Sequence, residues 1–378
     1  IIEETWKFSE RGFVHMKKIR EKFNIHGLMV SALFFGMTVA IPHTIVHATD
    51  MTTSATTTEI VSTEQAATEQ AVTEAVTENL SETDNNLSVV KIKSIDIVSK
   101  KSMKLTWEKK KDADGYIIFR KNGTEDWKKA GECKGGQKNS YVDEDLTYKN
   151  TYAYMVVPYQ KQNGSKVYVA PSGEGTAKKL AFRSKYKKGL KYYYDADGNV
   201  IKDVEGIIGE QKSYVLKVNT SACVVTVYAK DGKKGYKIPV KSFLCAPGKT
   251  NKTGTFYTGV THRYWVLFYN SYSQWTKQIH GNILFHTSPY TQYRNNKSLD
   301  VEEYNKLGTR ASHGCIRLQC VNMKWIYDHC KGRTKVVIYE SKNPGPFGKP
   351  ELEKLPSWHT WDPTDPASEK WCKKKGCH

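Results

Sequence analysis

The sequence predicts a mainly β protein, with a β-sandwich followed by a second, mostly β domain that carries one short helix. Three observations lead to this prediction. The chain has 378 residues, which leaves room for two or three domains. Aromatic residues make up 12% of it, including 23 Tyr, a composition that favours strands. Short apolar runs separated by turn residues recur from residue 88 onward, as expected for sandwiches and related sheets.

The N-terminal region has the pattern of a secretory signal. A basic stretch follows Met16, and residues 28–41 form an apolar run of 14 residues. That length is short for a membrane span, so we expect export with cleavage after Ala48; an uncleaved anchor is the alternative. Residues 1–15 precede the start expected at Met16, and we exclude residues 1–48 from the fold.

Residues 49–87 are predicted to be a disordered linker. Thr-Glu pairs recur through them, and Lys, Arg and aromatic residues are missing from position 49 to position 90. Such a segment buries too little apolar surface to offset the entropy of ordering.

Residues 88–178 alternate apolar and polar side chains in short runs. An early run ends in Trp107, and a later one begins near Tyr152 after a turn at Leu146. This pattern resembles a fibronectin type III module, in which we expect Trp107 and Tyr152 to be core and corner residues. The module is expected to act as a spacer or wall-contact domain.

The remaining chain divides into three parts. Residues 179–211 are a Tyr- and Lys-rich connector, with a hairpin expected over 192–200 that turns at Asp197-Gly198. Residues 212–340 contain the second domain, with strands expected at 214–218, 224–228, 236–240, 264–268, 283–285 and 335–339. A helix is expected to begin near Val321 and to end by Gly332. Residues 341–378 are rich in Pro and Trp, so we expect irregular structure that packs back on a domain.

The chemistry of the chain is concentrated in residues 312–318, which read Ser-His-Gly-Cys-Ile-Arg-Leu. Cys315 is separated from His313 by one glycine, and His286 precedes it by 29 residues. A thiol attacks as the thiolate, so it needs a nearby base or backbone amides that lower its pKa. The run therefore predicts a cysteine enzyme of the acyl-transfer class.

Further segments place this run in a family pattern. They are 246–248 (Ala-Pro-Gly), 253–256 (Thr-Gly-Thr-Phe), 285–287 (Phe-His-Thr) and 307–308 (Leu-Gly). With residues 312–318 they resemble the YkuD-type L,D-transpeptidases over roughly 212–340. Two departures are the Asn251-Lys252 pair, where relatives often have Thr-Pro, and a longer stretch between His286 and Ser312.

The roles of the site residues follow from the chemistry and from this resemblance. Cys315 is the nucleophile and His286 the base, with the Thr287 carbonyl holding its ring; exchanged roles for His286 and His313 are the alternative. Backbone amides around Gly314 are expected to form an oxyanion hole. Arg317 either binds a substrate carboxylate or makes a structural salt bridge. The predicted catalytic residues are Cys315, His286, His313 and Gly314, and the predicted substrate-binding residues are Ser312, Arg317 and Thr287.

The resemblance implies a substrate and a reaction. The enzyme would cut a peptidoglycan tetrapeptide stem after its diaminopimelate residue, release D-Ala and join the acyl group to a neighbouring stem. Carbapenems should then acylate Cys315. The net charge of +19 favours anionic wall polymers as further partners, and nucleic acid is not expected because no recognition motif for it is present.

Several alternatives remain open at this point. Water in place of the acceptor amine would give an L,D-carboxypeptidase, a sortase-like enzyme also uses Cys, His and Arg, and a non-catalytic wall-binding protein would leave the cysteine run unexplained. A zinc site would need ligands from His313, Cys315, Cys320, His329 and Cys330, but no paired Cys-x-x-Cys spacing is present. We therefore expect no metal and no cofactor. Among the eight cysteines, Cys372 and Cys377 are close enough in sequence to close a small loop.

Overall fold

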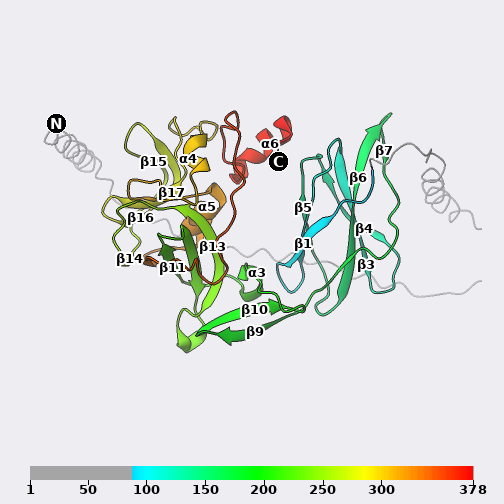
Figure 1. Ribbon diagram of the computed structural model, residues 1–378, viewed down its shortest axis with the longest axis horizontal. Helices are drawn as coiled ribbons and strands as arrows, with labels where there is room; N and C mark the ends of the chain where they lie inside the picture. The colour runs from blue at the N-terminus through cyan, green and yellow to red at the C-terminus, as the bar shows by residue number, and fades with distance from the viewer. Residues whose placement is uncertain (1–86, 378) are drawn as a thin grey trace, which may run out of the picture. The chain divides into compact units, whose positions relative to one another are not determined.

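A computed structural model describes residues 87–377 (Figure 1). The predicted signal sequence (1–48) and all but the last residue of the predicted linker (49–87) lie outside the described residues. Within them, strands outnumber helices throughout, which confirms the prediction of a mainly β fold. Each helix in this part of the chain is too short or too polar to cross a lipid bilayer.

The first domain is a β-sandwich, as predicted. Its strands are β1 (Ile92–Ile97), β2 (Met103–Trp107), β3 (Gly115–Asn122), β4 (Lys128–Lys134), β5 (Ser140–Asp143), β6 (Thr151–Gln162), β7 (Ser165–Val167) and β8 (Thr176–Lys179). One sheet has the order β1-β2-β5, and the other has the order β4-β3-β6-β7 with β8 paired to β6. Trp107 is fully buried in the core, and the Tyr152 hydroxyl accepts the Thr147 N–H at 2.9 Å, so both residues have the predicted places.

The connector begins with a hairpin of β9 (Phe182–Lys187) and β10 (Leu190–Asp195) and ends in the short helix α3 (Glu205–Ile208). The expected turn at Asp197-Gly198 is present, but only a single bridge between Tyr194 and Val200 closes it. The paired hairpin lies one strand earlier, turning at Lys188 and Gly189, because β10 pairs with β9 along its whole length.

The second domain is built on one nine-stranded sheet. Its elements are β11 (Tyr214–Asn219), β12 (Val224–Ala229), η1 (Gly232–Lys234), β13 (Ile238–Ala246), β14 (Gly254–Tyr257), β15 (Thr261–Val266), β16 (Tyr272–His280), β17 (Ile283–Thr287), α4 (Val301–Asn305), β18 (Ile316–Leu318), α5 (Cys320–His329) and β19 (Lys335–Tyr339). The strand order is β14-β19-β11-β12-β13-β18-β17-β16-β15. The pairs β11-β19 and β17-β18 are parallel, and the others are antiparallel.

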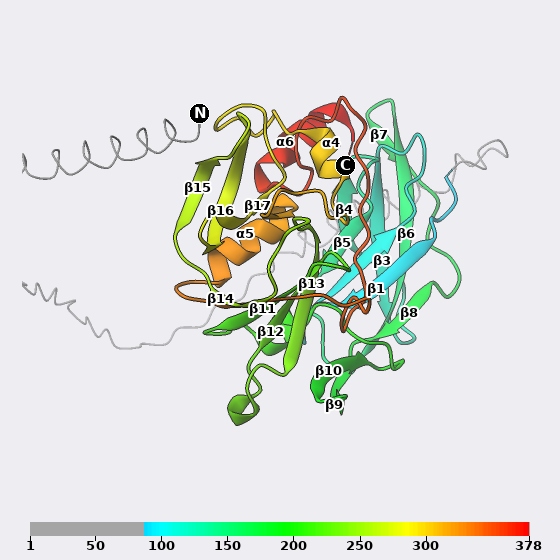
Figure 2. The same cartoon turned by 60° about the vertical axis from the view of Figure 1, so that its left-hand side comes forward.

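Helix α5 is the short helix predicted after the cysteine run. It buries Cys320, Met323 and Ile326 and packs against β16 and β17 (Figure 2). These buried residues recur at the 3.6-residue period of a helix, and that periodicity predicted the helix from the sequence. Val321, at its expected start, is exposed rather than buried.

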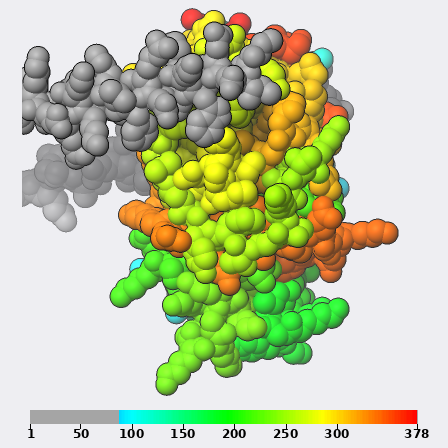
Figure 3. Space-filling view, turned by 90° about the vertical axis from the view of Figure 1, so that its left-hand side faces the viewer, coloured from blue at the N-terminus to red at the C-terminus, as the bar shows by residue number. Residues whose placement is uncertain are grey.

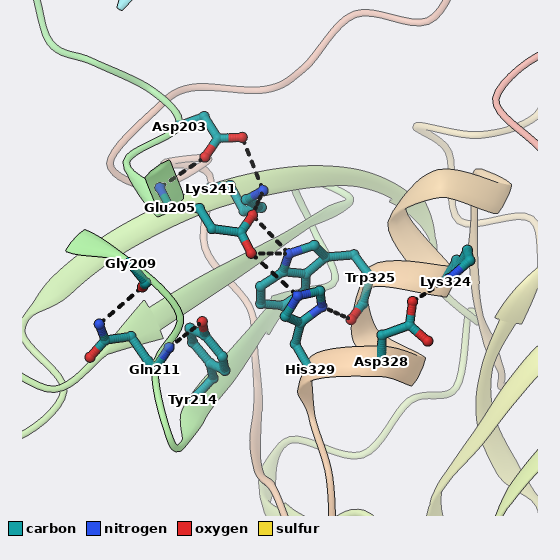
Figure 4. A network of polar contacts seen from close by, with 10 residues as sticks. All are labelled: Asp203, Glu205, Gly209, Gln211, Tyr214, Lys241, Lys324, Trp325, Asp328 and His329. Atoms are coloured by element: carbon teal, nitrogen blue, oxygen red, sulfur yellow. Dashed lines mark hydrogen bonds and ion pairs between the residues drawn. The ribbon is translucent and has the colours of Figure 1, made fainter. Parts of the chain in front are cut away.

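Connector and second domain are joined by a polar network around α5 (Figure 4). The Glu205 carboxylate of α3 accepts the Trp325 Nε1–H at 2.9 Å and pairs with Lys241 and with His329. The Trp325 and His329 rings are stacked 4.6 Å apart. Burial raises the pKa of Glu205, but hydrogen bonds from Lys241 and Trp325 outweigh burial and hold this pKa below its ordinary value. The network fixes the outer face of the helix that follows the candidate nucleophile.

The C-terminal segment packs on the second domain, as expected, but it is not wholly irregular. It ends in η2 (Pro366–Ser368) and α6 (Glu369–Lys375), and Trp361 is buried. Asp362 accepts the Cys320 N–H at 2.7 Å, and Asp365 accepts amide hydrogens of Gln274 at 2.8 Å and of Asn296. Because Gln319 makes no side-chain cap, Asp362 supplies the missing acceptor at the start of α5.

Replacing Asp362 by Ala is expected to destabilise the protein by about 1–3 kcal/mol, since it removes acceptors from buried N–H groups. Burial raises the pKa of Asp362 from 3.8 to about 6. A folded pKa above the unfolded one means that this carboxyl stabilises most at low pH and less as the pH rises from 3.8 to about 6. Thermal unfolding of wild type and Asp362→Ala should therefore differ more at about pH 4 than at about pH 7. An equal difference at both values would contradict this role.

Candidate active site

The candidate site lies near the middle of the nine-stranded sheet, where β17 and β18 run side by side. His286 on β17 pairs in register with Arg317 on β18, and Cys315 immediately precedes β18. Because the two strands are parallel, this pairing brings His286 and the cysteine run to the same region of the sheet. The 29-residue gap in sequence is therefore closed by strand pairing.

The turn that carries Cys315 is held by Ser312. The Ser312 hydroxyl accepts the Gly314 N–H at 3.0 Å and donates to the Cys315 carbonyl at 2.5 Å. Gly314 has φ of +150°, a conformation that costs a residue with a side chain far more than glycine. Ser312 is buried, so its hydroxyl shapes the turn rather than facing solvent.

A second loop braces the turn from the other side. Gly248 forms a parallel bridge with Ser312, and the Asn251 side chain joins the two loops. Asn251 accepts the Gly248 N–H at 2.6 Å and donates to the Gly314 carbonyl at 2.5 Å. In the sequence, Asn251 stands out only as a departure from the family pattern. The residues around it do not indicate which distant groups its side chain will contact.

Asn251→Ala should lower the rate of acylation at Cys315 about tenfold, because it removes the hydrogen bond to the Gly314 carbonyl and the one from the Gly248 N–H, which together join the two loops. The neighbouring exposed Lys252 provides the matched control as Lys252→Ala, which should acylate at the wild-type rate. Intact-mass time courses with an acylating β-lactam would measure both variants. Equal rates for Asn251→Ala and wild type would show that the hydrogen bonds of Asn251 are not needed to position the turn that carries Cys315.

His286 is almost fully buried, with 2% of its surface exposed. Its Nδ1–H donates to the Thr287 carbonyl at 2.5 Å, which leaves the lone pair on Nε2. Burial, together with the charge of Arg317, lowers the pKa of His286 to about 3. The imidazole is therefore neutral at physiological pH and is able to accept a proton.

The Cys315 thiol is also neutral at rest. Burial raises its pKa, while the Leu284 N–H and the charge of Arg317 oppose this effect. The thiol donates weakly to the Asn282 carbonyl at 3.8 Å, and no hydrogen bond joins it to His286 among the described residues. The pair is thus a thiol and an imidazole rather than a preformed ion pair.

Two N–H groups beside the thiol are available to a ligand. Within the described part of the chain, the backbone N–H groups of His313 and Cys315 donate to no residue. The Gly314 N–H, which was predicted to be an oxyanion-hole donor, instead donates to the Ser312 hydroxyl. The exposed His313 ring lies against Tyr269, with ring centres 5.5 Å apart.

Arg317 makes the salt bridge that was one of its two predicted roles. It is buried and pairs with Glu303 of α4, which also binds Lys306 at 2.8 Å. Thr287 is fully buried, and its hydroxyl accepts the Gln274 N–H at 3.2 Å. In this structure the side chains of Ser312, Thr287 and Arg317, which were predicted to bind substrate, are buried and contact other protein groups instead. Nothing in the sequence around Glu303 indicates that it pairs with Arg317.

A cavity of about 320 Å³ opens at Cys315. One wall consists of apolar and aromatic side chains around β15: Val260, His262, Trp265, Val266, Leu267 and Phe268. Phe268 is 72% exposed and Val266 60% exposed, so this wall presents unusual apolar surface to solvent. The side of the domain with β14 to β17 faces the viewer in Figure 3, as the yellow-green and yellow segments.

The zinc ligands considered from the sequence do not come together. Among residues 87–377, His313, Cys315, Cys320, His329 and Cys330 form no convergent group of three or more ligands. All eight cysteines, which lie in this range, are present as free thiols. Cys320 and Cys330 are buried in the core beside α5.

Comparison with known proteins finds relatives of the second domain. Residues 213–338 match the YkuD family, the L,D-transpeptidase catalytic domain. "Putative L,D-transpeptidase YciB" of Bacillus subtilis (strain 168) is 34% identical over 134 residues, which are 35% of this chain. The chain spans 62% of the length of that relative.

Two solved structures are similar at lower identity. The L,D-transpeptidase from Mycobacterium smegmatis is 13% identical, with a TM-score of 0.27, over 67% of this chain and 100% of that one. The L,D-transpeptidase LdtMt1 in complex with imipenem is 13% identical, with a TM-score of 0.27, over 67% and 99%. Scores this low add nothing to the family match. The comparisons therefore match residues 213–338 to the L,D-transpeptidase catalytic domain of the YkuD type.

Proposed function

We propose that this protein cross-links peptidoglycan stems through a thioester on Cys315. The observation that carries the proposal is the arrangement around the cavity. Cys315 lines it, and the neutral His286, its ring fixed by the Thr287 carbonyl, lies on the neighbouring parallel strand. A thiol, a base and free backbone N–H donors are what acyl transfer requires.

The reaction proceeds in two halves. Cys315 Sγ attacks the carbonyl that joins diaminopimelate to D-Ala, its proton passes to His286 Nε2, and the N–H groups of His313 and Cys315 stabilise the oxyanion. The C–N bond breaks, the leaving amine takes the proton, and a thioester remains. A side-chain amine of a second stem then attacks the thioester, the C–S bond breaks and the proton returns to sulfur.

In the same proposal, the rest of the chain brings the catalytic domain out of the cell and places it at the wall. The signal sequence exports the protein, the linker and the fibronectin type III-like sandwich space the catalytic domain, and the basic surface is attracted to anionic wall polymers. Carbapenems, which resemble an acyl donor, acylate Cys315.

The test is mass spectrometry of the protein (residues 49–378) incubated with a disaccharide-tetrapeptide muropeptide. We expect a dimer that lacks one D-Ala, and a trapped thioester on Cys315. Cys315→Ala should give neither product, whereas Cys133→Ala, which alters a thiol of the sandwich, should match wild type. Tripeptide without dimer would make the protein an L,D-carboxypeptidase. The absence of both product and thioester would refute the enzymatic proposal.

A further inference from the structure

Three potential metal ligands converge in the C-terminal segment, far along the chain from the cysteine run. They are His359, Cys372 of α6 and Cys377, here called the C-terminal cluster. Their ligand atoms all lie within 4.8 Å of one another. His359 is 1% exposed and Cys372 is 4% exposed, so two of the three ligands are withdrawn from solvent. Cysteine and histidine side chains are the ligand types of structural zinc sites.

The local backbone brings the two cysteines together. Gly376 ends α6 in the left-handed conformation, with φ of +62°, so the chain turns back on the helix. The Cys377 N–H then donates to the Cys372 carbonyl at 3.3 Å. The four-residue spacer Lys-Lys-Lys-Gly is therefore long enough to return the second thiol to the first.

The other two contacts resemble the outer shell of a metal site. His359 Nδ1 donates to the Trp361 carbonyl at 2.9 Å, which fixes the ring and makes Nε2 its ligand atom. The Trp361 indole N–H donates to Cys372 Sγ at 3.1 Å, a contact that stabilises a thiolate. One tryptophan thus orients both buried ligands.

We propose that His359, Cys372 and Cys377 bind a zinc ion. Two thiolates and one imidazole are ligands that zinc prefers in tetrahedral sites, whereas magnesium and calcium require oxygen ligands. The fourth tetrahedral position is left for a water molecule.

The site would be structural. Asp362 and Asp365 lie between His359 and Cys372 in the chain, and they hold the start of α5 and the side chain of Gln274 on β16. A zinc ion that ties His359 to the end of the chain would close this segment into a loop around both aspartates. The ion would thereby stabilise the capping of α5 without contacting Cys315.

Oxidation is the competing chemistry for the same thiols. A disulfide between Cys372 and Cys377 would consume two of the three ligands and remove the site. The two states are distinguishable by mass, because a disulfide lowers the mass by two hydrogens and blocks alkylation.

The experiment uses residues 49–378 with Cys315→Ala, so that the active-site thiol cannot contribute, purified with reductant and stripped of metal. Titration with Co²⁺ should end at one ion per chain, with d–d bands of a tetrahedral site and thiolate-to-cobalt charge transfer in the near ultraviolet. Zinc should then displace cobalt. Cys372→Ser and Cys377→Ser should each lose the charge-transfer intensity of one thiolate and bind at least about tenfold more weakly. Cys133→Ser, the matched control, should bind like the parent.

A second readout needs no substitution in the cluster. Zinc should protect Cys372 and Cys377, but not Cys133, from alkylation, and it should raise the midpoint of thermal unfolding. Binding that is unchanged in both cysteine variants, failure of cobalt to bind with thiolate charge transfer, or a Cys372–Cys377 disulfide in the isolated protein would each overturn the proposal. None of these readouts depends on transpeptidase activity, so the two proposals stand or fall separately.

Discussion

His286→Asn should lower the rate of Cys315 acylation by about 10²–10⁴-fold, the usual contribution of a general base. The reason is the resting state of the pair. Burial raises the pKa of the thiol and lowers that of His286 to about 3, so neither group is charged before the reaction. The thiol therefore depends on His286 to remove its proton during attack. Acylation by a carbapenem, followed by intact mass, would measure the rate in a single turnover.

The pH profile separates this role from a structural one. In the wild type the reactive state, neutral thiol with neutral imidazole, persists from above the His286 pKa of about 3 up to the raised thiol pKa, so the rate should be flat between about pH 5 and 8. Without the base, only preformed thiolate reacts, and the rate should rise about tenfold per pH unit.

His313→Asn is the matched control for the choice between the two histidines. The His313 ring is exposed and rests on Tyr269, so its loss should change the rate far less than that of His286 and leave the profile flat. A larger loss for His313→Asn, together with a pH-dependent rate, would assign the base to His313 instead.

Elements with strong local patterns were predictable. Strands β11, β12 and β19 follow continuous runs of β-branched and aromatic residues, and their predicted positions agree with the structure. Strand β16 was missed because its interior is polar. Ser273, Gln274 and Lys277 are buried in it. Ser273 is hydrogen-bonded to Thr276 of the same strand, Gln274 to Asp365 and Lys277 to Thr261. Apolar periodicity cannot reveal a strand of that kind.

Some residues of the candidate site were likewise predictable from the sequence, and others were not. Cys315, His313 and Gly314 are contiguous in sequence, so a short run revealed them, and the resemblance added His286. Asn251, Glu303 and Asp362 act on the site from remote loops, a short helix and the C-terminal segment. Each is a polar residue whose partner is chosen by the tertiary fold. Their roles therefore required coordinates.

Gly248→Ala is expected to have the second large effect on acylation, because Gly248 lies very close to Gly314. A Cβ at Gly248 would lie 2.5 Å from both Cα and N of Gly314. Those are backbone atoms, and they cannot rotate away as a side chain would. Gly248→Ala should therefore displace the turn that presents Cys315 and its N–H donors.

Displacement of this turn by about 1 Å should reduce acylation about 10²-fold while the nine-stranded sheet stays folded. Gly198→Ala is the matched control. Gly198 has a positive φ of +86°, its Cβ would meet no atom within 4 Å, and it lies in the connector turn. It should lose some stability through backbone strain and keep the wild-type acylation rate. If both variants lose activity in proportion to their lowered unfolding midpoints, general destabilisation accounts for the loss. If Gly248→Ala alone loses activity, the contact between Gly248 and Gly314 is what sets the position of the nucleophile.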